Sequence, residues 1–157
     1  MAGDRALLVA AKSGGLRVLD VRSPSLNELS FVPIPGGAER VAFDGRRALV
    51  AGGGALARLV TVDVADVASP LVVSSADLSP KRRDLSAKTS SGIVGAGSLV
   101  AAAFELETSD LVSQKSLLQL VAKDGAGVLA TDAFARANLP GASPIAFSEG
   151  RLIGTSA

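Results

Sequence analysis

The sequence predicts an all-β fold in which one four-stranded antiparallel unit recurs, and three observations predict it. Residues 35–52 (PGGAERVAFDGRRALVAG) recur near the end of the chain as residues 140–157 (PGASPIAFSEGRLIGTSA). Asp20 and Asp63, each followed by a valine, stand at equivalent places 43 residues apart. The 17 glycines and 7 prolines supply many turns. Because propeller blades have a period of ~40–45 residues, we expect β-propeller-like blades of four antiparallel strands in an incomplete ring.

The first half of the chain holds a partial blade, residues 3–33, and a full blade, residues 39–75. The strands expected in the partial blade are residues 6–11, 16–21 and 29–32. The strands expected in the full blade are residues 40–43, 47–51, 58–64 and 71–75. Period-two alternation supports the third of these strands, because Val60, Val62 and Val64 would lie on one face of the strand and the more varied Leu59, Thr61 and Asp63 on the other.

The second half holds a divergent blade, residues 91–132, and another partial blade, residues 143–157. The strands expected in the divergent blade are residues 93–94, 99–104, 116–122 and 128–131. The strands expected in the last blade are residues 144–147 and 152–155. Two insertions, residues 78–91 and 105–114, are expected to form loops, and loops on a rigid scaffold commonly carry recognition.

These strands amount to a little over three blades, whereas propellers typically close with about 4–8 blades. Three arrangements stay open. The remaining blades belong to a longer chain, two copies pair into one ring as a homodimer, or the sheets form an open arc or a compact β-sandwich-like fold. A terminal sheet that stays without a neighbour would expose apolar surface.

The composition argues against an enzyme. The chain has no Cys and no His, and it also lacks Tyr and Trp. It therefore has no thiolate nucleophile, no disulfide and no imidazole, the commonest general base and metal ligand. An active site built by this chain would have to use Asp, Glu, Lys, Ser or Thr alone, so we expect neither enzyme activity nor a cofactor.

Charge and hydropathy argue against nucleic acid and a membrane as partners. The 16 basic and 15 acidic residues give a net charge of +1, whereas nucleic-acid-binding proteins concentrate basic residues on one face. The basic cluster Lys81, Arg82 and Arg83 is followed at once by Asp84, so we interpret it as a solvated loop. No stretch approaches the ~20 apolar residues of a membrane span. The apolar run at residues 6–11 is shorter than the ~7–15 residues of a signal-peptide core.

Acidic residues offer two candidate cation sites. Asp20 and Asp63 would bind a cation as part of a carboxylate ring, but an Asp before a turn ordinarily accepts backbone N–H bonds, which is the interpretation we favour. Glu105, Glu107 and Asp110 form an acidic tip whose oxygen atoms suit calcium. This tip lacks the glycine-centred loop of a dedicated calcium site, so we favour a solvated tip and assign no metal.

Several motifs resemble the LVIVD-repeat family of β-propellers: GGLRVLDV, PGGA, VAF, RALVAG and LVTVDV with their Ser-Pro turns. The resemblance covers most of the chain. It departs from the family where Ala48 and Leu152 replace the usual aromatic residue, and where Ala-Lys-Asp at residues 122–124 replaces Asp-Val-Pro. The resemblance implies a repeat scaffold, frequently in exported or cell-surface bacterial proteins, and it implies no shared catalysis.

We therefore predict a non-enzymatic propeller segment that acts as a scaffold or binds a protein. The expected contact residues lie in the two inserted loops and are Lys81, Arg82, Arg83, Glu105 and Glu107. The expected partner is another protein, the remaining blades of the propeller or a second copy of the chain.

Two alternatives stay open. One is a hydrolase-type propeller whose site is completed by blades or a partner chain beyond this sequence. Its residues would come from the first strands and their flanks, which offer Glu39, Arg40, Ser86, Lys88, Ser143 and Ser148. The other is a structural module that calcium stabilises, in which case calcium raises the melting temperature by mass action. Fold alone does not decide among these functions.

Overall fold

The computed structural model describes residues 6–12, 14–52, 57–78, 85–108, 115–131, 135–140, 145–148 and 151–154. These residues form antiparallel β-strands joined by turns, so the fold is all-β as the sequence predicts. None of them belongs to a helix long and apolar enough to cross a membrane.

The described strands form four sheets, and in each sheet the strands are neighbours in chain order. The first sheet contains β1 (Ala6–Ala10), β2 (Leu16–Asp20) and β3 (Glu28–Val32). The second contains β4 (Arg40–Phe43), β5 (Arg47–Gly52), β6 (Arg58–Asp63) and β7 (Leu71–Asp77). The third contains β8 (Leu85–Ala96), β9 (Leu99–Thr108), β10 (Lys115–Ala122) and β11 (Ala135–Pro140). The fourth contains β12 (Ile145–Ser148) and β13 (Arg151–Gly154).

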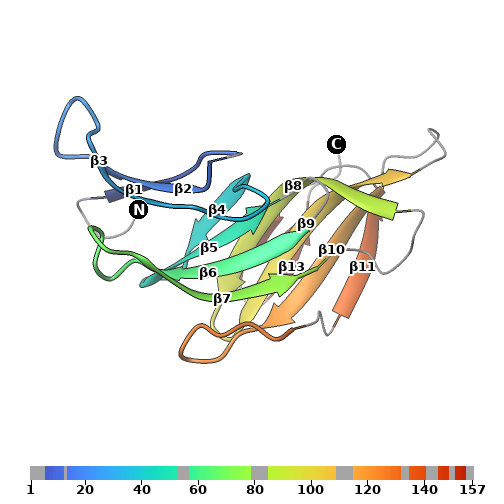
Figure 1. Cartoon of the computed structure of the whole chain (residues 1–157). Helices are drawn as coiled ribbons and strands as arrows, with labels where there is room; N and C mark the ends of the chain where they lie inside the picture. The colour runs from blue at the N-terminus through green and yellow to red at the C-terminus, as the bar shows by residue number, and fades with distance from the viewer. Residues whose placement is uncertain are drawn as a thin grey trace.

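The sheets follow one another in sequence order and pack face to face. Figure 1 shows the blue first sheet, the cyan-to-green second sheet and the yellow-to-orange third sheet from left to right. The contacts between sheets run through their leading strands: β1 lies against β4, β4 and β5 lie against β8, and β8 and β9 lie against β12. This succession of meandering sheets is an incomplete set of propeller-like blades.

Strand β5 shows why the middle sheets are apolar on both faces. Ala48 and Val50 belong to the apolar core between the first and second sheets. Leu49 and Ala51, which alternate with them, belong to the core between the second and third sheets. Since successive side chains of a strand point to opposite faces, a sheet with a neighbour on each side needs apolar residues at every position. All four side chains are fully buried.

The second and third sheets approach closely because one of the facing residues is a glycine. A Cβ atom added to Gly95 of β8 would lie 2.2 Å from the Leu49 Cδ1 atom of β5. That separation is far shorter than van der Waals contact, so Leu49 fills the space that a side chain at position 95 would take.

The repeat predicted from the sequence is present in backbone detail. A β-bulge interrupts the pairing of β2 with β3 between Val18 and Leu19. A second bulge interrupts the pairing of β6 with β7 between Thr61 and Val62, 43 residues further on. Bulges re-aim a strand and increase its twist, so the same device shapes both sheets at the same place.

The third sheet differs from the strands predicted for it. The predicted fourth strand at residues 128–131 is wrong: its place is taken by β11, and a single bridge between Lys123 and Leu129 marks the segment before it. The predicted first strand at residues 93–94 is too short, because β8 begins at Leu85, inside the predicted loop 78–91. Strand β9 likewise continues to Thr108, inside the predicted loop 105–114. The third sheet therefore extends beyond residues 91–132 at both ends.

Candidate functional site between the second and third sheets

Asp20 and Asp63 end their strands in equivalent turns. The Asp20 Oδ1 atom accepts a hydrogen bond from the Arg22 backbone N–H at 2.9 Å. The Asp63 Oδ1 atom accepts the corresponding bond from the Ala65 backbone N–H, also at 2.9 Å. This is the turn geometry in which an Asp side chain satisfies an N–H two residues further on.

Each of these carboxylates also pairs with an arginine. The Arg22 Nη2 atom lies 2.9 Å from Asp20 Oδ2, and this ion pair raises the pKa of the Arg22 guanidinium. The Arg46 Nη2 atom lies 2.9 Å from Asp63 Oδ2. The Ala65 backbone N–H and then the Arg46 side chain lower the pKa of the Asp63 carboxyl. These partners within the protein therefore favour the ionised form of the Asp63 carboxyl.

The other predicted binding residues are placed only in part. Glu105 lies in β9 and is half-buried, and Glu107 lies near the end of the same strand. Lys81, Arg82, Arg83 and Asp110 lie outside the described residues. Among the described ranges, no three acidic side chains gather closely enough to hold a metal ion together.

Glu39 and Arg40, two residues of the hydrolase alternative, join the second sheet to the third. The Glu39 Oε2 atom accepts a hydrogen bond from the Thr89 Oγ1 atom at 2.8 Å and another from the Ser90 backbone N–H. The Arg40 Nε atom donates to the Ser91 carbonyl oxygen at 3.3 Å. These polar groups therefore hold β4 to β8 at the leading edge of the two sheets.

The remaining residues of that alternative are not brought to this place. Ser86 and Lys88 lie in β8 and Ser148 lies in β12, and only their backbone is described. Ser143 lies outside the described residues.

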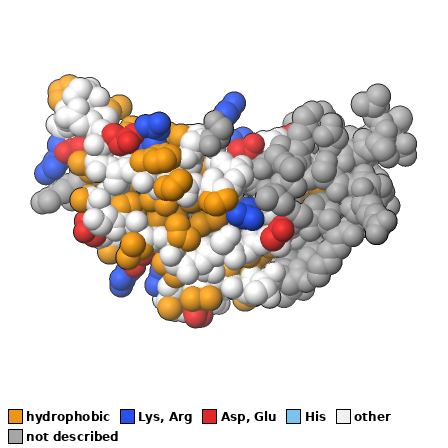
Figure 2. Space-filling model, in the orientation of Figure 1, with side chains coloured by type: hydrophobic (Ala, Val, Ile, Leu, Met, Phe, Trp, Pro, Cys, Tyr) orange, Lys and Arg blue, Asp and Glu red, His pale blue; other side chains and the backbone are white. Residues whose placement is uncertain are grey.

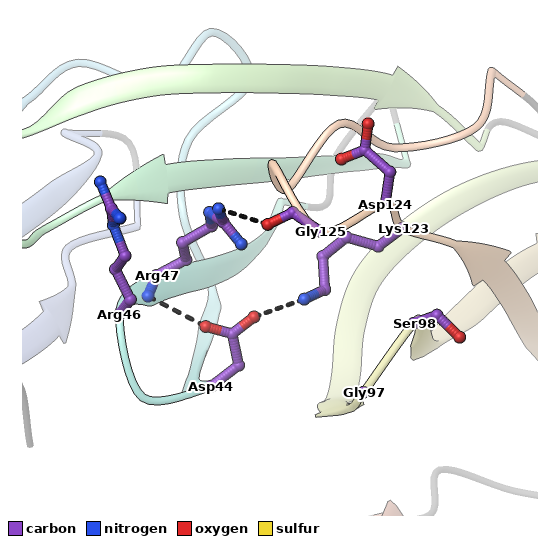
Figure 3. A pocket seen from close by; sticks show the side chains of 8 residues that line it. All are labelled: Asp44, Arg46, Arg47, Gly97, Ser98, Lys123, Asp124 and Gly125. Carbon is purple, nitrogen blue, oxygen red and sulfur yellow. Dashed lines mark hydrogen bonds and ion pairs between the residues drawn. The ribbon is translucent and has the colours of Figure 1, made fainter.

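A pocket of about 220 Å³ opens between the second and third sheets. It is formed by the β4–β5 turn, the β8–β9 turn and the segment that follows β10 (Figure 3). Its lining residues are Asp44, Arg46, Arg47, Gly97, Ser98, Lys123, Asp124 and Gly125. Three cations and two carboxylates therefore meet in a small space.

The Asp44–Lys123 ion pair is the most buried polar contact of this pocket. The Lys123 Nζ atom lies 2.6 Å from Asp44 Oδ2, and the two side chains are only 6% and 11% exposed. The Arg47 backbone N–H donates to the other oxygen, Asp44 Oδ1, at 2.9 Å. Burial opposes ionisation of Asp44, but the hydrogen bonds from Lys123 and the Arg47 amide outweigh it and lower its pKa. Figure 3 shows the carboxylate held between these two donors.

Residues 123–130, which we call the strap, cross from the third sheet to the second. Arg47 donates from Nη2 to the Gly125 carbonyl oxygen at 2.8 Å, and Thr61 donates from Oγ1 to the Gly127 carbonyl oxygen at 2.7 Å. In the opposite direction the Leu129 backbone N–H donates to Ser74 Oγ at 3.1 Å. The strap thus binds β5, β6 and β7.

The Leu129 side chain anchors the strap in the core. It is 5% exposed and belongs to the apolar cluster between the second and third sheets. Within the strap, the Asp124 Oδ1 atom accepts a hydrogen bond from the Val128 backbone N–H at 2.8 Å, which stabilises the turn. The strap therefore has a charged end at Lys123 and an apolar end at Leu129.

Lys123 occupies the place that Val64 has in the preceding sheet. The Val64 backbone N–H donates to the Arg46 carbonyl oxygen of the β4–β5 turn, and the Lys123 backbone N–H donates to the Ser98 carbonyl oxygen of the β8–β9 turn. Val64 packs into the core against the first sheet. A buried lysine therefore replaces a buried valine at one sheet interface, and Asp44 supplies its counter-charge.

The sequence patterns do not predict this site. Asp44 and Lys123 are 79 residues apart, and neither belongs to a motif with a recognised spacing. One signal was available, because residues 122–124 depart from the repeated Asp-Val-turn pattern at the place where Lys123 is found.

No family model matches this sequence, and no curated protein matches it. The geometry of the described residues is therefore what bears on function. That geometry provides a cluster of charged side chains between the second and third sheets. In this cluster Lys123 pairs with Asp44, and Arg46 pairs with Asp63.

Proposed function

We propose that the chain is a non-enzymatic, propeller-like segment, of the LVIVD-repeat kind, that acts as a scaffold and binds a protein. The main support is the face of the first sheet that points away from the second sheet. This face is apolar and partly exposed, whereas the equivalent face of the second sheet is covered by the first sheet. The repeated bulges and the repeated turns at Asp20 and Asp63 support the repeat interpretation.

The outward face is defined by the pairing of β1, β2 and β3. Leu7 pairs with Leu19 across β1 and β2. Neither side chain belongs to the core between the first and second sheets, and both are partly exposed. In the second sheet the corresponding pair, Ala48 and Val62, is fully buried beneath the first sheet.

Phe31 extends this face onto β3. It is 40% exposed, and the Arg17 guanidinium lies 5.3 Å from the centre of its ring. Arg17 also pairs with Glu28, so the charges on this face neutralise each other. In Figure 2 another group of hydrophobic side chains is visible where the second sheet meets the first. An apolar face with paired charges at its margin is typical of a protein contact surface.

The experiment that tests this proposal is a binding measurement with matched variants. Partners are captured by cross-linking in the source cells and identified, and the affinity of each purified partner is measured by calorimetry. Phe31→Lys and Leu19→Lys should weaken the affinity about tenfold or more, because aromatic and aliphatic anchors dominate such contacts. Leu71→Lys is the matched control, since Leu71 is 69% exposed on β7, away from this face.

Two results would count against the proposal. One is an affinity that Phe31→Lys, Leu19→Lys and a joint replacement of Lys81, Arg82 and Arg83 all leave unchanged. The other is turnover of ester or glycoside substrates by the purified chain, which would favour the hydrolase alternative.

A further inference from the structure

The strap is held at its two ends by different kinds of interaction. At one end, Lys123 forms the buried ion pair with Asp44 of the β4–β5 turn. At the other end, Leu129 fills the core between the second and third sheets. Between the ends, the contacts to the second sheet are single hydrogen bonds to Arg47 and Thr61. The ion pair is thus the only contact of the strap with the described part of the second sheet in which both partners are ionised side chains.

The contact at the charged end depends on both partners being ionised, whereas the contact at the apolar end does not depend on ionisation. A buried ion pair balances a large desolvation cost against Coulomb attraction, so removing the charge of one partner leaves the other buried and uncompensated. The preceding sheet interface has no such dependence, because Val64 takes the equivalent place there. The interface between the first and second sheets is therefore stabilised at this place by an apolar side chain, and the interface between the second and third sheets by an ion pair.

We propose that the Asp44–Lys123 pair is a lock that holds the strap on the second sheet, and that neutralising Asp44 in acid releases the strap. Release breaks the hydrogen bond between the Leu129 amide and Ser74, and it opens the interface between the second and third sheets at the edge that the strap covers. The strap itself stays folded, since Asp124 caps it from within.

The other charged groups around Asp44 do not replace Lys123. On its own turn, Arg46 pairs with Asp63, and Arg47 directs its side chain to the Gly125 carbonyl oxygen. On the strap, Asp124 is exposed and accepts the Val128 amide. The facing β8–β9 turn contributes Gly97 and Ser98, which carry no charge.

Hydrogen exchange followed by NMR tests the proposal, because two neighbouring amides report different events. The Leu129 N–H bonds across to Ser74 of β7, whereas the Val128 N–H bonds within the strap to Asp124. Asp44→Asn should speed exchange at Leu129 at least about tenfold at neutral pH, because a buried charge loses its counter-charge. Exchange at Val128 should change far less.

The matched control is Arg46→Gln, which removes the exposed pair with Asp63 from the same pocket and should leave exchange at Leu129 unchanged. Wild-type protein should show faster exchange at Leu129, corrected for intrinsic chemistry, once the pH falls below the ordinary Asp value of 3.8. This measurement needs no variant, so it decides the matter even when Asp44→Asn does not fold.

Lys123→Met provides the complementary test. It places an apolar side chain where the preceding interface has Val64 and leaves the Asp44 carboxylate without its counter-charge. Acid should then no longer speed exchange at Leu129, because it neutralises a buried charge that has no partner. The proposal is overturned when exchange at Leu129 is the same in Asp44→Asn and wild type, or when wild-type exchange does not respond to acid. It is also overturned when Lys123→Met keeps the full acid response.

Discussion

Gly15 lies in the turn between β1 and β2 with a φ of 122°, a conformation that residues with a Cβ atom rarely adopt. A Cβ atom there would also lie 2.2 Å from the Val32 carbonyl oxygen, which belongs to the backbone and has little room to move. Gly15→Ala should therefore destabilise the protein by about 2–4 kcal/mol, measured by urea unfolding. Gly45→Ala is the matched control: φ is 100°, but nothing lies within 4 Å of the added atom, so about 1–2 kcal/mol is expected. Equal losses in the two variants would show that the clash at Gly15 contributes nothing.

Asp20 and Asp63 illustrate what a single residue in the sequence does and does not specify. An Asp that recurs before a turn predicts a local hydrogen bond to a backbone N–H, because the side chain reaches only two or three residues. The structure has those bonds at 2.9 Å in both turns. Asp44 forms the same kind of local bond, to the Arg47 amide, but its second oxygen binds a residue 79 positions away. No local rule predicts that second partner.

At the scale of elements, the question is how much the Leu129 side chain of the strap stabilises the interface between the second and third sheets. Leu129 is 5% exposed in the core, whereas its neighbour Val128 is 46% exposed. Leu129→Ala should cost about 2–4 kcal/mol in the free energy of unfolding, because it leaves a cavity between two sheets. Val128→Ala should change this free energy by less than about 0.5 kcal/mol. A loss at Val128 as large as that at Leu129 would mean that the segment is stabilised by its backbone conformation and not by this anchor.

Gly95 and Leu49 should behave as a coupled pair. Gly95→Ala places a methyl group against the Leu49 side chain across the interface and should destabilise by about 1–3 kcal/mol through overpacking. Leu49→Ala alone should cost about 2–5 kcal/mol through a cavity. The double variant should cost clearly less than the sum, because the new methyl group partly fills the new cavity. Additive losses in a double-mutant cycle would contradict the close approach of β5 and β8.

The strands of the second sheet were predictable, as were the two middle strands of the third sheet, whereas the first and last strands of the third sheet were not, for a physical reason. In β6, strict alternation and a turn residue at each end mark the strand locally, and the structure has it at Arg58–Asp63. At residues 128–131 the sequence is equally apolar, but Leu129 is buried against a different sheet and Ala135–Pro140 completes the ladder with β10. Apolar content predicts burial, and it does not predict which neighbour provides it.

At the scale of the whole molecule, the buried Asp44 makes stability depend on pH in a predictable direction. Its pKa in the folded protein is lower than the ordinary value of 3.8, so its contribution is fully present above that value. The contribution is lost as the pH falls through the lower folded pKa. Chemical denaturation across the acid range should therefore show a smaller acid-induced loss of stability for Asp44→Asn than for wild type. Parallel pH profiles for the two proteins would show that Asp44 is not linked to global unfolding.

The meandering order of the sheets has a consequence for how the chain folds. Every described strand pairs with a strand adjacent to it in the sequence, so each sheet closes through short loops and the entropy lost on closure is small. The order of events should then follow the order of synthesis, since a sheet is complete before the next one begins. What a newly made sheet still lacks is the neighbour that covers its second face. Each folding intermediate would therefore expose an apolar face for a short time. The rate at which the next sheet forms and covers that face would set the risk of aggregation.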